Sequence, residues 1–262
     1  MTGHRWTRVA AAAAAGYAAG LVPSADVAAR LASGGRVDLR EHGSGNPGGA
    51  NAAAVLGARW GYGVMAADIA KGAIATRVGR LVAGDTGQHI AAVAAVVGHC
   101  YPVTKQFRGG KGVGCSVGQC LATLPAYVPI DIAIATAVAV GPSKQRAFTA
   151  TAASSALWVG AATLWWRRGW PNAWGGTPTV GLPLAAAASS AVILQRFWAG
   201  HRRLTTAPVS GFPAAAVARR DHNLVIGDPA TGSSTSSKLS ALQSRWSRGS
   251  GTWPSPTRHR HW

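Results

Sequence analysis

Charged residues are scarce in this chain of 262 residues. They make up 13% of the sequence, whereas about 25% is typical of soluble domains. Hydrophobic residues reach 48%, and there are 34 glycines in addition. A soluble domain of this length needs a charged surface, which this composition does not supply. Disorder of the whole chain is excluded as well, because disordered chains combine low hydrophobicity with high charge. The composition therefore favours a membrane protein.

Acidic residues are especially few, with 8 Asp and Glu against 26 Lys and Arg, which gives a net charge of +18. Five of the positive charges follow residue 228, in a segment without acidic residues, and the others form small clusters between uncharged runs. Nucleic-acid-binding proteins concentrate positive charge on one face or arm. Clusters that separate apolar runs are instead typical of loops between membrane spans, so we predict no nucleic-acid partner.

Cysteine is also rare. The three residues Cys100, Cys115 and Cys120 form no even-numbered disulfide framework. Together with His99 they lack the paired C-x-x-C spacing of a zinc site. We interpret them as small apolar residues of the interior and predict no metal.

Long apolar runs are what the sequence does contain. A helix that spans a bilayer needs about 20 mostly apolar residues. Such runs predict an all-α, polytopic membrane bundle of about seven helices, at about 9–30, 58–77, 86–101, 112–127, 129–143, 147–166 and 180–199. The second run contains Asp68 and Lys71. The N-terminal run resembles a secretory signal peptide, but it leads directly into the first motif, so we predict a retained helix.

The charges of the loops predict an orientation. With seven spans, one side carries eleven Lys and Arg before the C-terminal tail, and the other side carries six. The positive-inside rule therefore predicts that the N-terminus lies outside the cell and that the loops near 31–57 and 101–111 are cytoplasmic. We predict a membrane domain over 1–228 and a disordered, basic cytoplasmic tail over 229–262, where Ser, Thr, Gly and Arg replace the apolar residues.

The first motif is the run G-S-G-N-P-G-G-A-N at 43–51. It matches the G-x-G-x-x-G pattern of dinucleotide-binding folds, with Asp68 about 20 residues further on. A buried strand precedes that pattern in a Rossmann fold, whereas the segment from Arg36 to His42 contains four charged residues. This argues against a dinucleotide site. The glycines leave a backbone whose N–H groups can converge on an anion. An ordinary loop is the alternative.

The second motif begins with G-H-C-Y-P at 98–102 and continues with F-R-G-G-K-G-V-G at 107–114. It is not a Walker A sequence, because Lys105 stands where that motif has its first glycine and Gly112 stands where it has Ser or Thr. Two cations among glycines are suited to bind phosphate, although they can also serve only to anchor the loop. His99 lies where the apolar run meets this loop. A third short segment, R-R-D-H-N at 219–223, follows the last predicted span.

The order of these motifs resembles the bacterial acyl-phosphate:glycerol-3-phosphate acyltransferases, the PlsY family. Members have a G-S-G-N-P-G-A-T-N loop after helix one, a G-H-x-F-P…F-K-G-G-K-G loop after helix three and an R-H-x-x-N segment after helix seven. The D-I-A-K-G run at 68–72 is similar to the D-x-x-K-G of the family's second helix. The resemblance covers about residues 9–228.

The resemblance implies an enzyme of the bacterial plasma membrane. It would transfer a fatty acyl group from acyl phosphate to the 1-hydroxyl of glycerol-3-phosphate, giving lysophosphatidate and phosphate, with no cofactor and with membrane lipids around it. The residues that match catalytic positions of the family are Ser44 and His99. Those that match its phosphate- and substrate-binding positions are Gly43, Gly45, Asn46, Gly48, Asn51, Arg108, Gly109, Gly110, Lys111, Gly112, Arg220, His222 and Asn223.

The chain also departs from the family pattern. Ala54 stands where the family usually has an arginine. The nearest cation, Arg59, lies five residues further, which on one continuous helix is about 140° around the axis. In the third segment Arg220 takes the family's histidine position and His222 is displaced beside it. A degenerate paralogue that binds lipid or phosphate without turnover is therefore the alternative function. A transporter fits less well, because transporter sites lie at the membrane midplane.

Overall fold

A computed structural model describes residues 2–140, 146–174 and 176–206, and these residues form helices and connecting segments without a strand. The eight α-helices belong to one compact unit, Met1–Ala207. The predicted all-α class is confirmed. The predicted domain boundary at 228, the tail over 229–262 and the third motif, with Arg220, His222 and Asn223, lie outside the described residues.

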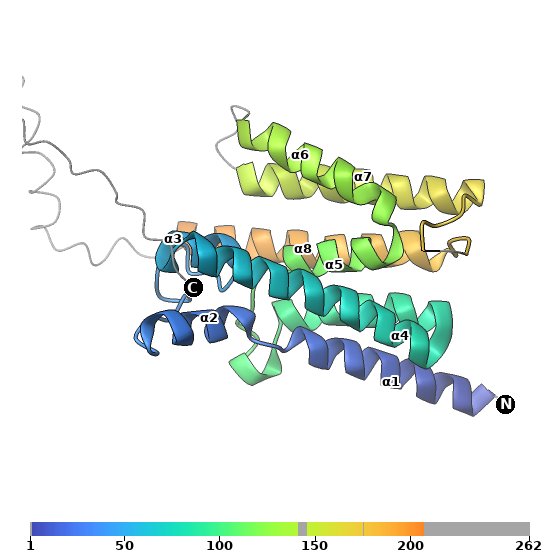
Figure 1. Cartoon of the computed structure of the whole chain (residues 1–262), viewed down its shortest axis with the longest axis horizontal. Helices are drawn as coiled ribbons and strands as arrows, with labels where there is room; N and C mark the ends of the chain where they lie inside the picture. Colours follow the sequence, from blue (N-terminus) through green and yellow to red (C-terminus); the bar gives the residue numbers. More distant parts are fainter. Residues whose placement is uncertain (1, 141–145, 175, 207–262) are drawn as a thin grey trace, which may run out of the picture. The chain divides into compact units, whose positions relative to one another are not determined.

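The described helices, two of them single 3-10 turns, follow one another along the chain and are visible in Figure 1. Their bounds are α1 Thr2–Gly20, α2 Ser24–Ser33, α3 Gly49–Leu56, α4 Ala58–Cys100, η1 Val103–Lys105, α5 Val113–Thr123, η2 Pro125–Tyr127, α6 Val128–Val140, α7 Arg146–Arg168 and α8 Gly181–Thr206.

Helix α4 is a hairpin of two helices. Its helical geometry is interrupted at Ala83 (φ −141°, ψ 28°) and at Gly84 (φ 63°, ψ −150°). The segments before and after the break pack antiparallel. Near the turn a Cβ on Gly79 would lie 2.4 Å from the Cβ of Ala91. At the far end Asp68 and His99 come within 3.7 Å of each other. The hairpin therefore supplies two of the predicted spans.

Small residues let α1 lie directly on the second half of α4. A Cβ on Gly16 would stand 2.2 Å from the carbonyl oxygen of Ala91, and a Cβ on Gly98 would stand 2.4 Å from that of Tyr17. Close backbone approach through Gly and Ala is how membrane helices associate when lipid offers no hydrophobic driving force. The alanine-rich sequence of α1 is thus a packing surface, and its N-terminal end is tied by Arg8 Nε to the carbonyl of Val82 at 2.6 Å.

Six of the seven predicted spans coincide with described helices, the span at 129–143 as far as Val140, since residues 141–143 lie outside the described residues. The first span does not. Helix α1 begins at Thr2 and ends at Gly20, whereas the prediction ran to residue 30. Pro23 (φ −88°, ψ 64°) breaks the run, and a separate short helix, α2, begins at Ser24. A proline removes a backbone N–H and disfavours helical geometry in the residue before it. Residues 24–30, which we predicted as the end of the first span, therefore belong to a short helix in the connection between α1 and α3.

Three segments of the described chain have the length and apolarity to cross a membrane, namely Ala58–Lys105, Ala147–Arg168 and Gly181–Ala199. Helices α5 and α6 are apolar but have only 11 and 13 residues, fewer than the roughly 17 that a bilayer needs. The 3-10 turn η2 joins α5 to α6 at the end away from the glycine loops.

Figure 1 places α2, α3 and the loops around them at one end of the bundle, and the N-terminus and the turn of α4 at the other. The loop before α3 contacts the loop after α4, since Arg40 Nε donates to the carbonyl oxygen of Arg108 at 3.0 Å. The fold therefore brings the first two motifs to the same end of the bundle.

Candidate active site

The side chain of Asn51 organises the first motif. Its Oδ1 accepts a hydrogen bond from the backbone N–H of Ser44 at 2.8 Å, and its Nδ2 donates to the carbonyls of Leu39 and His42, both at 2.9 Å. Asn51 is buried at the first turn of α3, so the loop is wrapped around its amide. Gly43 permits this wrapping, because it has a φ of +62° and a Cβ there would lie 2.2 Å from Asn51 Oδ1.

The same loop presents Ser44 to solvent. Ser44 is exposed, while Pro47 and Gly48 behind it are buried. A Cβ on Gly48 would lie 2.7 Å from Asn46 Nδ2, so the Asn46 amide lies against the start of α3. The N–H groups at the start of a helix and in a glycine-rich loop are free to bind an anion.

The second motif folds back over His99. The N–H of Gly110 donates to the carbonyl oxygen of His99 at 3.1 Å. A Cβ on Gly109 would stand 2.1 Å from that same oxygen, and a Cβ on Gly110 would stand 2.2 Å from His99 Nε2. Glycine is therefore required at both positions for the loop to lie on the buried imidazole. Gly112 ends the loop in the left-handed region, with φ +87°, and α5 begins at the next residue.

Arg196 of α8 fastens the glycine loop from the other side. Its Nη2 donates to the carbonyl oxygen of Gly109 at 2.7 Å, and its Nε donates to that of Gly110 at 3.2 Å. The guanidinium also lies over the ring of Tyr101, 5.1 Å from the centroid. These two hydrogen bonds fix the orientation of the peptide groups of Gly109 and Gly110. Arg196 therefore holds the glycine loop in one conformation.

Lys111 follows this pair of glycines. Its ammonium lies over the ring of Phe197, 4.0 Å from the centroid. Burial lowers the pKa of Lys111, and the charge of Arg196 lowers this pKa further. The ammonium is thus partly desolvated and has no carboxylate partner in the described chain. A cation in this state gains more from an anionic ligand than a fully solvated one does.

Asp26 of α2 links the two loops. Its carboxylate lies 2.6 Å from Arg40 Nη1 and 2.9 Å from Lys105 Nζ. Burial alone raises the pKa of Asp26, but the hydrogen bonds and charges of Arg40 and Lys105 outweigh this effect and leave the pKa below its usual value. Burial lowers the pKa of Arg40, but its contacts with Asp26 and Asp38 outweigh this effect and raise the pKa. The carboxylate is therefore ionised and holds both cations at the mouth of the site.

A second polar cluster lies deeper, where the hairpin of α4 meets the α1–α2 connection. Asp68 Oδ1 accepts a hydrogen bond from the hydroxyl of Ser24 at 2.5 Å and lies 2.9 Å from Lys71 Nζ. The Lys71 ammonium also donates to the carbonyl oxygen of Val22 at 3.0 Å. His99 Nδ1 lies 3.7 Å from the same Asp68 oxygen. Asp68, Lys71 and His99 are all buried, so the charges are paired within the bundle.

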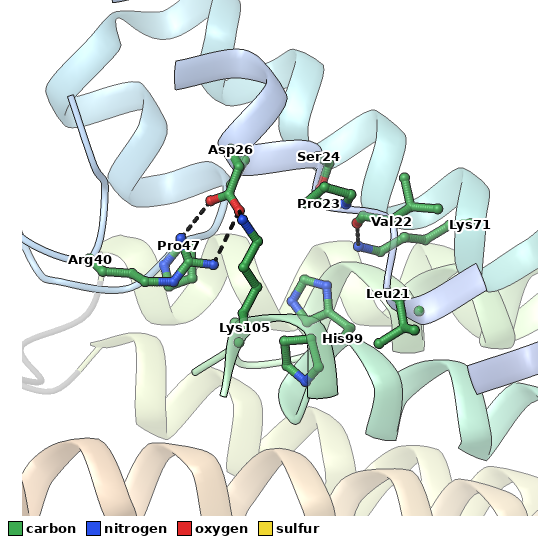
Figure 2. Close-up of a pocket in the computed structure, with 15 residues that line it drawn as sticks. Leu21, Val22, Pro23, Ser24, Asp26, Arg40, Pro47, Lys71, His99 and Lys105 are labelled. Atoms are coloured by element: carbon green, nitrogen blue, oxygen red, sulfur yellow. Dashed lines mark hydrogen bonds and ion pairs between the residues drawn. The ribbon is translucent and has the colours of Figure 1, made fainter. Parts of the chain in front are cut away.

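A pocket of about 320 Å³, partly open to solvent, joins these two clusters. Figure 2 shows Asp26, Arg40 and Lys105 on one side of it, with Lys71 and His99 on the other. Its lining residues are Gly20, Leu21, Val22, Pro23, Ser24, Ala25, Asp26, Arg40, Pro47, Lys71, His99, Pro102, Lys105, Gly109 and Gly110. The pocket is therefore lined by the cations Arg40, Lys71 and Lys105, the carboxylate of Asp26 that pairs with Arg40 and Lys105, the imidazole of His99 and the glycine loop.

Comparison with known proteins identifies this arrangement. A family model described as glycerol-3-phosphate acyltransferase matches residues 10–207. The chain belongs to this family. The match includes every described helix of the bundle except the first turns of α1. The predicted family is confirmed, and with it the interpretation of the apolar runs as parts of an integral membrane protein.

Individual relatives support the assignment. The chain is 43% identical over 105 residues to the glycerol-3-phosphate acyltransferase of Thermoanaerobacter pseudethanolicus, which is 40% of this chain and 53% of that protein. For the Bacillus subtilis enzyme the identity is 43% over 109 residues, covering 42% and 55%. The chain thus spans about half the length of the curated relatives that it matches.

Two crystal structures of PlsY (YgiH), an integral membrane glycerol 3-phosphate acyltransferase, share the fold. The glycerol 3-phosphate form has a TM-score of 0.59 at 26% identity, covering 79% of this chain and 98% of that one. The lysophosphatidic acid form has a TM-score of 0.59 at 25% identity, covering 80% and 98%. The likeness to the solved acyltransferases therefore extends over nearly their whole length.

The structure of this family member brings together some of the predicted site residues. His99, Gly109 and Gly110 line the pocket, and Pro47 is the residue of the first motif that reaches it. Ser44 lies in the neighbouring loop, outside the pocket lining. Gly43, Gly45, Asn46, Gly48 and Asn51 shape that loop, while Arg108, Lys111 and Gly112 continue the second one.

Several polar residues of the site were missed by the sequence analysis. Lys71 was noted as a charge in an apolar run and as part of the D-I-A-K-G run at 68–72, but it was not named as a site residue, although a paired ionisable residue in a membrane segment is itself a functional signal. Asp26, Arg40 and Lys105 carry no motif. Arg196 lies in the last predicted span, and its distance of 86 residues from Gly110 gives no local signal.

The geometric argument about Arg59 was wrong in its premise. Ala54 and Arg59 do not lie on one helix, because α3 ends at Leu56 and Gly57 (φ 99°, ψ 159°) separates it from α4. Arg59 is exposed and lies over the ring of Trp60, 5.2 Å from the centroid. It therefore does not replace the arginine that the family usually has at the position of Ala54.

Proposed function

We propose that this chain transfers a fatty acyl group from acyl phosphate to the 1-hydroxyl of glycerol-3-phosphate. The products are 1-acyl-glycerol-3-phosphate, or lysophosphatidate, and inorganic phosphate. Family membership supports the reaction class, and the substrate and product named for the two PlsY crystal forms support the acceptor. The acyl-phosphate donor follows from the resemblance of the two glycine-rich motifs.

The observation that carries the proposal is the pocket in which the glycine loop, His99 and three cations meet. Both substrates bear a phosphate, and a site for them needs backbone N–H groups and cations at one place. Lys111 and Arg108 supply the cations of the second loop. The N–H groups of Gly109 and Gly112 lie beside them, whereas that of Gly110 donates to the carbonyl oxygen of His99 and fixes the loop. Arg220, His222 and Asn223 belong to the same proposed binding set through the resemblance of the third motif.

The reaction needs little from side chains. The 1-hydroxyl oxygen attacks the carbonyl carbon of the acyl phosphate, and the bond from that carbon to the phosphate oxygen breaks. The hydroxyl proton passes to an oxygen of the departing phosphate. Because phosphate is a good leaving group, positioning of the two anions and stabilisation of the developing charge supply most of the catalysis.

We assign catalytic roles to Ser44 and His99 within this scheme. The exposed Ser44 hydroxyl can donate a hydrogen bond to a phosphate or to the carbonyl oxygen. His99 borders the pocket between Asp68 and Gly110. Asn51 acts through Ser44, because its amide fixes the loop that carries this residue. At Gly43, Gly45 and Gly48 the missing side chain lets a phosphate approach the backbone closely. The side-chain amide of Asn46 can donate a further hydrogen bond.

The proposed setting is the plasma membrane of a bacterium. In this orientation the N-terminus lies outside the cell, and both glycine-rich loops and the C-terminal tail lie in the cytoplasm, where glycerol-3-phosphate is found. The excess of positive charge in the loops near the motifs supports this orientation.

The test is an assay of the purified full-length protein in detergent, with acyl phosphate and labelled glycerol-3-phosphate. We expect labelled lysophosphatidate and one phosphate released per acyl group transferred. Ala54 favours one second candidate, a paralogue that binds phosphate without turnover. Binding of glycerol-3-phosphate without product, under conditions in which the Bacillus subtilis enzyme is active, would establish that candidate and overturn the proposed activity.

A further inference from the structure

A second cavity lies within the bundle, apart from the proposed active site. It has a volume of about 500 Å³, is partly open, and shares no lining residue with the first pocket. Helices α5, α6, α7 and α8 enclose it. Its lining residues are Val113, Ser116, Val117, Asp131, Ala135, Ala150, Thr151, Ser154, Ser155, Trp158, Ser190 and Ile193. Half of them carry a hydroxyl or a carboxylate, which is unusual among helices this apolar, and none is cationic.

Two of the lining residues have buried polar atoms that find no partner in the described chain. They are the indole Nε1 of Trp158 and the hydroxyl Oγ of Ser190. Each residue is only 5% exposed. A buried donor without a partner costs free energy and is rare in folded proteins. Because both residues line the cavity, a hydrogen-bond acceptor bound there could satisfy these two donors.

Asp131 provides a hydrogen-bond acceptor on the same cavity. It is the single charged residue of α6, and Ser154 of α7 donates a hydrogen bond to its Oδ1. A carboxylate has about four acceptor positions, so Asp131 can accept a further hydrogen bond from a ligand. Ionisable residues are rare in the apolar helices of membrane proteins and often mark functional sites.

We propose that this cavity binds an uncharged lipid that carries one ester carbonyl and a free hydroxyl, that is, a monoacylglycerol. Its carbonyl oxygen accepts hydrogen bonds from Trp158 and Ser190, its hydroxyl donates to Asp131, and its chain lies along Val117, Ala135 and Ile193. A phosphate is disfavoured, because the lining offers a negative charge and no cation. The site goes beyond the proposed reaction and does not depend on it.

The experiment uses the full-length protein in detergent and a monoacylglycerol with a diazirine in its acyl chain. After irradiation, the labelled residues are mapped by mass spectrometry. We expect saturable labelling of the segments of α6, α7 and α8 that line the cavity. Monoolein should compete for it, whereas methyl oleate, which lacks the free hydroxyls, should compete at least about tenfold more weakly.

Variants test the assigned contacts. Trp158→Phe and Ser190→Ala remove the donors, and Asp131→Asn removes the carboxylate, so each should reduce saturable labelling at least about fivefold. Matched controls are Trp166→Phe, on the exposed side of α7, and Asp85→Asn, at the turn of α4. Neither control should change the labelling. Elution as a folded monodisperse species is checked for every variant, and if Asp131→Asn misfolds, the two donor variants decide.

Three results would overturn the proposal. Labelling that does not saturate would mean that the cavity holds water only. Equal labelling of Trp158→Phe and Trp166→Phe would show that the indole of Trp158 makes no hydrogen bond to the lipid. Lysophosphatidate competing as well as monoolein would show that an anionic headgroup is accepted, which contradicts an uncharged ligand. Because the readout is binding, an inactive enzyme with normal labelling would overturn the proposed function and leave this site intact.

Discussion

Gly110 lies directly against the imidazole of His99, so that a Cβ on Gly110 would stand 2.2 Å from His99 Nε2. Gly110→Ala must therefore displace the buried ring or lift the glycine loop from it. Overpacking of this kind costs about 1–3 kcal/mol. If that cost falls on the active geometry, we expect turnover to fall about 5- to 150-fold. The measurement is kcat for lysophosphatidate formation in detergent.

The matched control for this change is Gly63→Ala on α4. A Cβ on Gly63 meets nothing within 4 Å, and alanine is the better helix former. The control variant should keep full activity. Equal activity of the two variants would mean that the contact between the glycine loop and His99 is irrelevant to turnover.

Arg196 provides the second prediction, because it holds the carbonyls of Gly109 and Gly110 at 2.7 and 3.2 Å. Lysine cannot bind both carbonyls in this planar arrangement. Arg196→Lys and Arg196→Gln should both lower kcat at least about tenfold, equivalent to ~1.4 kcal/mol, with a smaller change in KM for glycerol-3-phosphate. Arg167→Gln, at the opposite end of the bundle, is the control. A change in KM alone would identify Arg196 as a substrate-binding residue instead of a positioning residue.

The sequence predicts most of this fold because long apolar runs leave few alternatives. The apolar runs that form α7 and α8 contain one charged residue between them, Arg196. Their positions are predicted to within a few residues, except that α8 continues further at its C-terminal end. The end of α1 could not be read in the same way. The alanine-rich pattern continues past Gly20 with Ala25 and Ala28 and favours a longer helix, whereas Pro23 favours an end. The sequence does not show which of the two effects is stronger, because the contacts with neighbouring helices decide it.

The site could be predicted only where its residues are local in sequence. The glycine loops are contiguous, so their motifs are visible. The pairing of Asp26 with Arg40 and Lys105, and the reach of Arg196 to Gly109, join segments that only the packed bundle brings together. Lys71 was readable in principle. A charge in an apolar run is expensive unless it is paired, and Asp68 lies one turn before it.

Lys111 distinguishes catalysis from anchoring of the loop. Its ammonium lies over the ring of Phe197, 4.0 Å from the centroid, and has no carboxylate partner in the described chain. Lys111→Gln removes the charge, and a charge-assisted hydrogen bond is worth roughly 1.5–3 kcal/mol. We expect kcat/KM to fall about 10- to 150-fold, with normal insertion into the membrane.

Lys105→Gln is the comparison for this variant. Lys105 is paired with Asp26 and its side chain is 41% exposed, so its loss should lower Tm slightly and reduce turnover much less. If both variants keep the activity of the native protein, Lys111 contacts no substrate phosphate.

The carboxylate of Asp26 predicts a dependence of stability on pH. Its pKa in the folded protein lies below the usual value of 3.8, because the cations Arg40 and Lys105 outweigh the effect of burial. A lowered pKa stabilises the fold above the unfolded pKa, and this stabilisation is lost as the pH falls through the folded pKa. Asp26→Asn should cost about 1 kcal/mol at pH 7, or about 2–4 °C in Tm.

As the pH falls through the folded pKa of Asp26, which lies below 3.8, the native protein and Asp26→Asn should therefore converge in Tm, since the carboxylate loses its charge there. Asp38→Asn is the control, because Asp38 is 49% exposed and lies 3.5 Å from Arg40. It should shift Tm by less than Asp26→Asn at pH 7. A difference that persists unchanged into acid would show that packing, not charge, is what Asp26 contributes.

The orientation in the membrane can be tested with single cysteines. Cys100, Cys115 and Cys120 are first replaced by alanine, and Ser44→Cys, Arg108→Cys, Asn223→Cys and Asp85→Cys are then made one at a time. Arg40 ties the first loop to the carbonyl of Arg108 at 3.0 Å. Positions 44 and 108 must therefore lie on one side of the membrane, whichever side that is. The turn of α4 at Asp85 lies at the opposite end of the bundle (Figure 1).

In intact cells, a membrane-impermeant thiol reagent should label the cysteine at 85 and leave those at 44, 108 and 223 unlabelled. Permeabilisation should make the last three reactive. This expectation rests on the eleven basic residues predicted for the side of the motifs against six for the other side. Labelling of 44 and 108 from outside, with 85 protected, would invert the orientation and leave the site intact. Labelling of 44 without 108 would contradict the packing of the two loops and with it the shared site.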